Sequence, residues 1–141
     1  MQACSARPAV HAYGAVLAAC SRCGLWQLAL ELMDEMLRRR VALNTVVCST
    51  GISSCEKGRQ WRRALGLLAG MRRLAVEPNT ITYSAVISAC EKGSQWGRAL
   101  ALLGCMPQYS CTPNAVTYGG AISACEKGYR WEAAVDLLAQ M

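Results

Sequence analysis

The chain has 141 residues, of which 53% are hydrophobic and 17% charged, and its 15 basic and 9 acidic residues give a net charge of +6. This composition excludes a disordered tail, which would be polar and rich in charge, and no apolar run approaches the roughly 18 residues of a membrane span. The single histidine, His11, argues against histidine-based metal sites and histidine-dependent catalysts. The length allows one compact domain or one stretch of an elongated array.

The sequence repeats itself every 35 residues. The segment Ser-Ser-Cys-Glu-Lys-Gly at 53–58 returns as Ser-Ala-Cys-Glu-Lys-Gly at 88–93 and again at 123–128. Tryptophans, alanines and methionines keep the same interval: Trp26, Trp61, Trp96, Trp131, Ala29, Ala64, Ala99, Ala134, Met36, Met71, Met106 and Met141. Such self-similarity is the signature of a repeat architecture.

The register of the repeat divides the chain into four units. These are residues 10–44, 45–79 and 80–114, followed by a truncated unit at 115–141. Residues 1–9 are interpreted as a lead-in or as the tail of a preceding repeat, because they are too short and too polar for a signal peptide. The truncated ends lead us to expect further repeats or domains of a longer chain.

Each unit has the pattern of a helical hairpin. In the unit 80–114, a first apolar stripe with helical spacing is formed by Tyr83, Val86, Ile87 and Cys90. Gly93 then acts as a C-terminal stop, with Lys92 just inside it, where a cation favours the helix dipole. A second stripe follows at Trp96, Ala99, Leu100, Leu103 and Met106. We expect the tryptophan to anchor the second helix as a core residue, and the alanine to mark a close approach of the two helices.

A hairpin of this kind cannot bury two apolar stripes alone, so neighbouring units must stack. The sequence therefore predicts an all-α fold, a right-handed α-solenoid of helix-turn-helix repeats. The opposite face of each first helix is small, hydroxylated and closed by a cation, as in Ile81, Ser84, Ser88 and Lys92. Such a face is a poor core surface and a plausible ligand-facing one.

Several motifs in these units resemble the pentatricopeptide repeat (PPR) family, in its P-type form with 35-residue units. They are Ile81-Thr82-Tyr83 and Val116-Thr117-Tyr118 at the start of the first helix, Ala64-Leu65 and Ala99-Leu100 in the second, and the closing Pro78-Asn79 and Pro113-Asn114. The first unit departs from the pattern, because Leu43 replaces the closing proline and Gly24 falls one place late, behind Cys23.

The resemblance implies single-stranded RNA as partner, with one base bound per repeat by two or three side chains. The fifth and last residues of each unit would recognise the base: Gly14, Asn44, Ser49, Asn79, Ser84, Asn114 and Gly119. A serine with an asparagine implies adenine at the second and third repeats. The second residues would stack on bases: His11, Val46, Ile81 and Val116. The cations Arg22, Lys57, Lys92 and Lys127 would face phosphates.

The resemblance also implies a setting in a chloroplast or mitochondrion and a role in RNA processing, stability, splicing or translation.

Structural roles remain open for the residues assigned to RNA contacts. Asparagine directly before a helix is a favoured N-cap, the serines suit capping or solvent positions, and the lysines suit the helix dipole. A protein-binding scaffold of the tetratricopeptide type is the alternative function, and a structural spacer is a third.

The cysteines and acidic residues do not suggest an enzyme. Cys20, Cys55, Cys90 and Cys125 share one repeat position, and helices packed about 8–10 Å apart exceed the roughly 7 Å limit for a disulfide. We therefore expect core residues in a reduced setting, with no metal site and no cofactor. The zinc-deaminase motifs of some PPR relatives are absent, and the only aspartates are Asp34 and Asp136, whereas a two-metal nuclease needs clustered carboxylates.

Overall fold

The computed structural model describes residues 6–41 and 43–140, and side chains from residue 11 onward within these ranges. The described residues form eight α-helices: α1 (Ala6–Cys23), α2 (Trp26–Arg38), α3 (Thr45–Lys57), α4 (Trp61–Arg73), α5 (Thr80–Lys92), α6 (Trp96–Cys105), α7 (Ala115–Lys127) and α8 (Trp131–Gln140). A short 3-10 turn, η2 (Met106–Tyr109), extends α6, with Pro107 in its first turn. No strand occurs in the described ranges.

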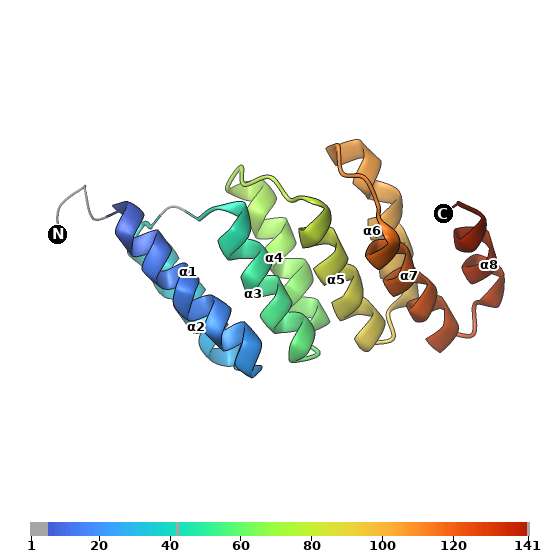
Figure 1. Cartoon of the computed structure of the whole chain (residues 1–141), viewed down its shortest axis with the longest axis horizontal. Helices are drawn as coiled ribbons and strands as arrows, with labels where there is room; N and C mark the ends of the chain where they lie inside the picture. Colours follow the sequence, from blue (N-terminus) through green and yellow to red (C-terminus); the bar gives the residue numbers. More distant parts are fainter. Residues whose placement is uncertain (1–5, 42, 141) are drawn as a thin grey trace.

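The helices form two layers that run along a curved array, with α1 and α8 at opposite ends (Figure 1). The first helices, α1, α3, α5 and α7, contact one another in sequence order. The second helices α2, α4 and α6 each contact the first helix of their own unit and that of the next. The predicted all-α solenoid of helical hairpins is confirmed. None of the helices in the described ranges has the length and apolarity needed to cross a membrane.

The apolar stripes found in the sequence form the core. Tyr83, Val86, Ile87 and Cys90 are fully buried on α5, as are Ala99 on α6 and Met106 at the start of η2. Cys20, Cys55 and Cys125 are also buried at the position equivalent to Cys90. The prediction that these four cysteines are core residues is confirmed.

The tryptophans meet the expectation in part. Trp26, Trp61, Trp96 and Trp131 begin α2, α4, α6 and α8; the first three are half-buried, and Trp131 is 68% exposed. Trp61 and Trp96 pack against the core, as expected. They are not fully buried, because the ring lies between units at the surface, where it forms cation–π contacts: Arg98 lies 5.0 Å from the centre of the Trp61 ring.

The recurrent glycine has a packing role. Gly93 has a φ of −90°, so it needs no left-handed backbone, but a Cβ built on it would overlap the Trp61 ring. The left-handed residue is the next one, Ser94, at φ 57°. The Gln95 N–H then bonds to the Cys90 carbonyl at 2.8 Å, which closes the helix.

The same geometry explains the shifted glycine of the first unit. Gly24 has φ +73° and no atom near its missing Cβ, and it is the counterpart of Ser94 one repeat position after the packing glycine. Cys23 stands where the other units carry the packing glycine. The glycine of the first unit therefore serves the backbone turn, and those of the later units give room to a tryptophan.

Replacement of Gly93 by alanine will destabilise the chain, since the added methyl group displaces the Trp61 ring near its attachment point. We expect a loss of about 1–3 kcal/mol, typical of overpacking. Gly66→Ala is the matched control, because Gly66 is exposed in α4 with open space beside it and alanine should add about 0.5–1 kcal/mol there. Urea unfolding measures both; equal effects of the two substitutions would contradict the packing role.

Burial also determines which thiols react. It raises the pKa of the Cys55 and Cys90 thiols to about 11, whereas Cys23 is exposed. Because the thiolate is the reactive form, Cys23 should be alkylated rapidly in the native protein at neutral pH. Cys55 and Cys90 should react only as the chain unfolds. Peptide mass spectrometry after a brief exposure to iodoacetamide checks this order, and rapid native labelling of Cys90 would contradict it.

Candidate nucleic-acid interface

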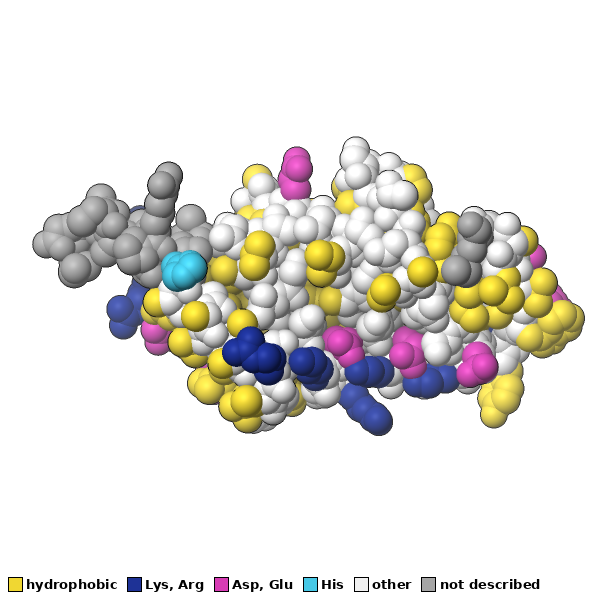
Figure 2. Space-filling view, in the orientation of Figure 1, with side chains coloured by type: hydrophobic (Ala, Val, Ile, Leu, Met, Phe, Trp, Pro, Cys, Tyr) yellow, Lys and Arg dark blue, Asp and Glu magenta, His cyan; other side chains and the backbone are white. Residues whose placement is uncertain are grey.

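The outer surface of the first helices carries a row of exposed aliphatic side chains. Val46, Ile81 and Val116 are 73%, 68% and 65% exposed, each one residue inside the N-terminus of α3, α5 or α7. Figure 2 shows hydrophobic side chains spaced along this surface, with His11 near one end. We call it the first-helix face, defined by Val46, Ile81, Val116 and the exposed asparagines Asn44, Asn79 and Asn114. Exposure at every repeat is consistent with the predicted stacking role, which remains a prediction.

The asparagines cap the first helices. Asn44, Asn79 and Asn114 are the N-cap residues of α3, α5 and α7, and each Oδ1 accepts a hydrogen bond from the backbone N–H three residues later. The donor–acceptor distances are 2.8, 3.0 and 3.0 Å. The capping role considered from the sequence is confirmed. The side chains are nevertheless exposed, and their role in recognising bases remains a prediction.

The serines are joined to the next unit. Ser49 Oγ lies 2.7 Å from Thr82 Oγ1, and Ser84 Oγ lies 2.7 Å from Thr117 Oγ1. Ser49 is half-buried, whereas Ser84 is only 8% exposed. Gly14 and Gly119, at the same repeat position, offer no hydroxyl group. Thr82 therefore connects Ser49 to Asn79, the two residues predicted to recognise one base.

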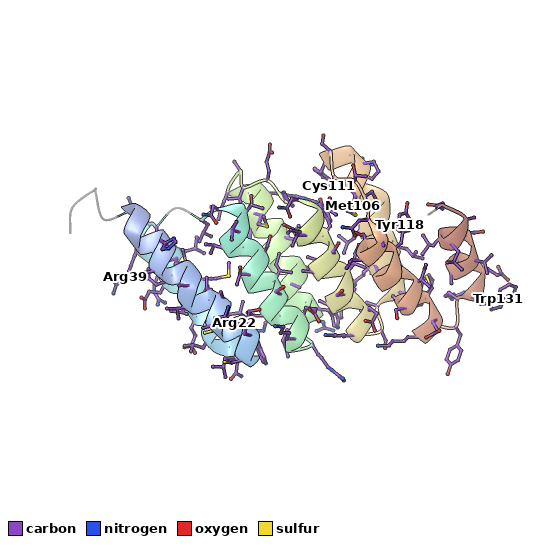
Figure 3. All side chains as sticks on the ribbon, viewed as in Figure 1. Arg22, Arg39, Met106, Cys111, Tyr118 and Trp131 are labelled. Carbon is purple, nitrogen blue, oxygen red and sulfur yellow. The ribbon has the colours of Figure 1, made fainter. Side chains whose placement is uncertain are left out.

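A groove of about 340 Å³ collects the predicted residues of the second unit. Val46, Ser49, Asn79 and Ile81 all line it, together with Arg22 from the C-terminal end of α1. Figure 3 shows Arg22 near that end of α1. The structure thus brings five predicted residues together around one open space. They are one exposed aliphatic residue from each of the first helices α3 and α5, a serine, an asparagine and a cation.

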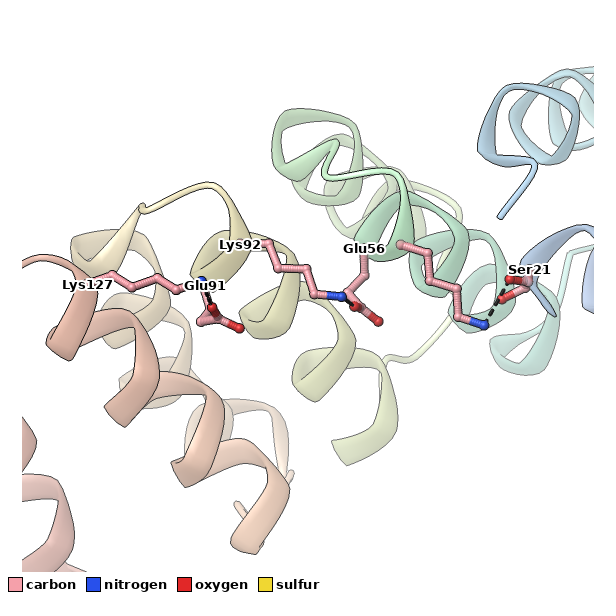
Figure 4. Close-up of polar contacts among 6 residues, drawn as sticks. Ser21, Glu56, Glu91, Lys92 and Lys127 are labelled. Carbon is pink, nitrogen blue, oxygen red and sulfur yellow. Dashed lines mark hydrogen bonds and ion pairs between the residues drawn. The ribbon is translucent and has the colours of Figure 1, made fainter. Parts of the chain in front are cut away.

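The lysines form contacts between units (Figure 4). Lys57 Nζ donates to the Ser21 carbonyl at 2.9 Å, Lys92 pairs with Glu56, and Lys127 pairs with Glu91. The side chains of Lys92 and Lys127 remain 36% and 45% exposed. Their predicted contact with phosphates is untested, and a phosphate would have to share each ammonium with a glutamate.

Some functional candidates were missed from the sequence. Thr82 and Thr117 are fully buried polar residues that complete capping boxes with Asn79 and Asn114. The Asn-x-x-Thr spacing is a recognisable form of the capping box and could have identified them. Glu56 and Glu91 carried no such signal, because each pairs with a lysine 36 residues further on.

Neither metal-binding nor carboxylate clusters appear in the part of the chain that the structure describes. No three histidine, cysteine, aspartate or glutamate side chains there are arranged to hold a metal ion. The two aspartates, Asp34 and Asp136, lie on different helices, α2 and α8.

The sequence matches two descriptions of one family. The PPR repeat family matches residues 43–92, and the PPR repeat matches residues 11–41 and 81–111. The chain therefore belongs to the PPR family. No individual curated protein matches it.

Solved PPR proteins share its fold. The PPR domain of Arabidopsis thaliana protein-only RNase P 1, solved in complex with tRNA, is 20% identical, with a TM-score of 0.85 over 94% of this chain and 70% of that one. PPR10 in complex with an 18-nt psaJ RNA element is 33% identical, with a TM-score of 0.83, and covers 94% of this chain and 19% of its own. PPR10 from maize is 26% identical, with a TM-score of 0.69, covering 78% of this chain and 16% of its own. This chain thus spans about a fifth of PPR10.

Removal of one inter-unit ion pair should have a small, local effect on stability. Glu91→Gln leaves Lys127 without its partner; because the lysine is 45% exposed, the loss should be about 0.2–1 kcal/mol and should shrink in high salt. Glu126→Gln is the matched control, since Glu126 has the same repeat position and is exposed. Urea unfolding at low and high salt measures the difference, and an equal change in both variants would contradict a stabilising pair.

Proposed function

We propose that this chain binds single-stranded RNA along the first-helix face, with one base per repeat, and that the units 45–79 and 80–114 favour adenine. The observation that carries the proposal is the groove in which Val46, Ser49, Asn79 and Ile81 converge. The solved RNA complexes of family members with the same fold support it.

The groove offers the chemistry that a single-stranded base requires. Val46 and Ile81 present aliphatic side chains, 73% and 68% exposed, that can cover the two faces of a base. Asn79 and Ser49 lie at the edge of the same space and can form hydrogen bonds with the base edge. RNA-binding repeats recognise unstacked bases by this combination of stacking and edge contacts.

Cations along the array would contact the phosphates. Arg22 lines the groove, and Lys57, Lys92 and Lys127 lie at one repeat position on successive first helices. Each neutralised phosphate should make binding weaker as salt increases. Because two adenine-specific units select too short a sequence, the chain would act with further repeats of a longer protein.

The proposed biological role rests on RNA binding. As part of this proposal, the chain catalyses no reaction itself and serves RNA processing, stability, splicing or translation in a chloroplast or mitochondrion. Its family membership supports this setting, and localisation of the full-length product, tagged at its C-terminus, tests it.

The double substitution Asn79→Asp and Asn114→Asp tests the adenine preference. Aspartate is as good an N-cap as asparagine, so the fold should persist, but the amide N–H donors are lost. We expect the ratio of oligoadenylate to oligouridylate affinity to fall by about tenfold, within the range for one good base contact. Fluorescence anisotropy at low salt measures both affinities.

Asn44→Asp is the control for that experiment. Asn44 caps α3 in the same way, but Gly14 gives its unit no serine partner, so its substitution should change the ratio less. Equal binding of oligoadenylate and oligouridylate by the parent chain would contradict the proposed specificity.

A further inference from the structure

The buried threonine of each first helix lies at the centre of a small polar network. Thr82 Oγ1 is 3.2 Å from the Asn79 backbone N, 3.0 Å from Asn79 Oδ1 and 2.7 Å from Ser49 Oγ. Thr117 repeats this arrangement with Asn114 and Ser84, at 3.2, 2.9 and 2.7 Å. Both threonines are fully buried, so only these neighbours satisfy their hydroxyl groups.

Proton counting fixes the direction of every bond in the network. The Thr82 backbone N–H must donate, so the asparagine atom that faces it is the carbonyl oxygen Oδ1. Oδ1 cannot donate, so the single hydroxyl proton of Thr82 points to it. The Thr82 oxygen then accepts from the Asn79 backbone N–H and from the Ser49 hydroxyl. Ser49 is therefore the donor in its bond with Thr82.

These bond directions give Asn79 and Ser49 a defined polarity: they determine which of the two presents a hydrogen-bond donor to the groove and which an acceptor. Asn79 Oδ1 already accepts two hydrogen bonds, so the amide Nδ2 group is left as a donor to the groove. The Ser49 proton is committed to Thr82, so its oxygen is left as an acceptor. The Watson–Crick edge of adenine presents the N6 amino donor next to the N1 acceptor, which complements this pair. Hypoxanthine, the base of inosine, presents an oxygen acceptor next to an N–H donor at the same positions and does not.

We propose that Thr82 and Thr117 are positioning residues that set this polarity and thereby determine the preference for adenine over a purine with the reversed edge. This inference rests on the proposed RNA-binding function and adds a residue that contacts no base. The threonine acts through its neighbour Ser49: without the threonine hydroxyl, Asn79 is still oriented by the Thr82 backbone N–H, but Ser49 could present either a donor or an acceptor.

The junction between the first and second units provides a natural comparison. Val47 stands at the position equivalent to Thr82 and still forms part of a capped helix, in which the Asn44 Oδ1 accepts from the Val47 N–H at 2.8 Å. Valine at this position is therefore compatible with the fold. The first unit also carries Gly14 in place of the serine, so this junction has neither the serine hydroxyl nor the threonine hydroxyl of the network.

The first experiment compares Thr82→Val/Thr117→Val with Thr80→Val. Thr80 lies in the same turn, but its hydroxyl bonds to the Thr112 carbonyl at 3.0 Å and not to the asparagine. We expect the ratio of affinities for an oligoadenylate and for the same oligonucleotide with inosines to fall by about fivefold or more in the Thr82/Thr117 variant, in line with the loss of one ordered hydrogen bond. Thr80→Val should leave the ratio unchanged, and Thr82→Ser/Thr117→Ser should restore it, because serine keeps the hydroxyl group.

The second experiment builds the network at the junction of the first and second units and does not depend on removing any threonine. A Cβ on Gly14 would lie 3.8 Å from Val47 Cγ2, which is ordinary contact, so a serine fits. Gly14→Ser alone should add little selectivity, whereas Gly14→Ser/Val47→Thr should increase the ratio of adenine to inosine affinity. Circular dichroism confirms that each variant is folded.

The outcomes separate the two proposals. A parent chain that binds no RNA, or binds oligoadenylate and oligouridylate equally, overturns the proposed function and the positioning role with it. A parent chain that prefers oligoadenylate to oligouridylate but binds adenine and inosine equally, or whose folded Thr82→Val/Thr117→Val variant keeps an unchanged adenine-to-inosine ratio, overturns the positioning role alone. The positioning role is also overturned if Gly14→Ser alone increases the selectivity as much as the double variant does.

Discussion

Each helical hairpin in this chain has two apolar stripes and can cover only one of them by itself. The first helices therefore lie against each other in sequence order, and α2, α4 and α6 each pack between the first helices of their own unit and the next. Fully buried residues such as Tyr83 and Ile87 belong to this shared core. Because neighbouring units stabilise one another, the register of the repeats is fixed. The exposed positions on the first helices therefore recur at the same spacing.

The same register places polar groups where the core ends. At the N-terminus of α5, Asn79 satisfies the Thr82 backbone N–H and remains exposed. Different atoms of one side chain can therefore serve the cap and the proposed recognition: Oδ1 faces the helix, and the amide Nδ2 is left for a ligand. The bond between Ser49 and Thr82 links two units, so the stacking of the solenoid also fixes the spacing of the groups around the groove.

The fold was predictable from periodicity, because helix faces are set by local spacing. The stripe from Tyr83 to Cys90 and the cap at Asn79 depend on residues within one helix, and both are observed as expected. The contacts that escaped prediction join residues in successive units. Lys92 meets Glu56 and Trp61 packs on Gly93 only once the units are stacked, and one sequence contains no direct signal of that geometry. The surface position of the tryptophans has the same cause.

The central claim is that RNA lies along the first-helix face with one base between each pair of successive first helices. Backbone amide chemical shifts, measured by NMR during titration with oligoadenylate at low salt, test it directly. The account predicts that the largest shifts occur at Val46, Ser49, Asn79 and Ile81, with little change at Leu68 and Ala69 on the second helix α4. Shifts concentrated on the second helices, or no shifts at any concentration of RNA, would contradict it.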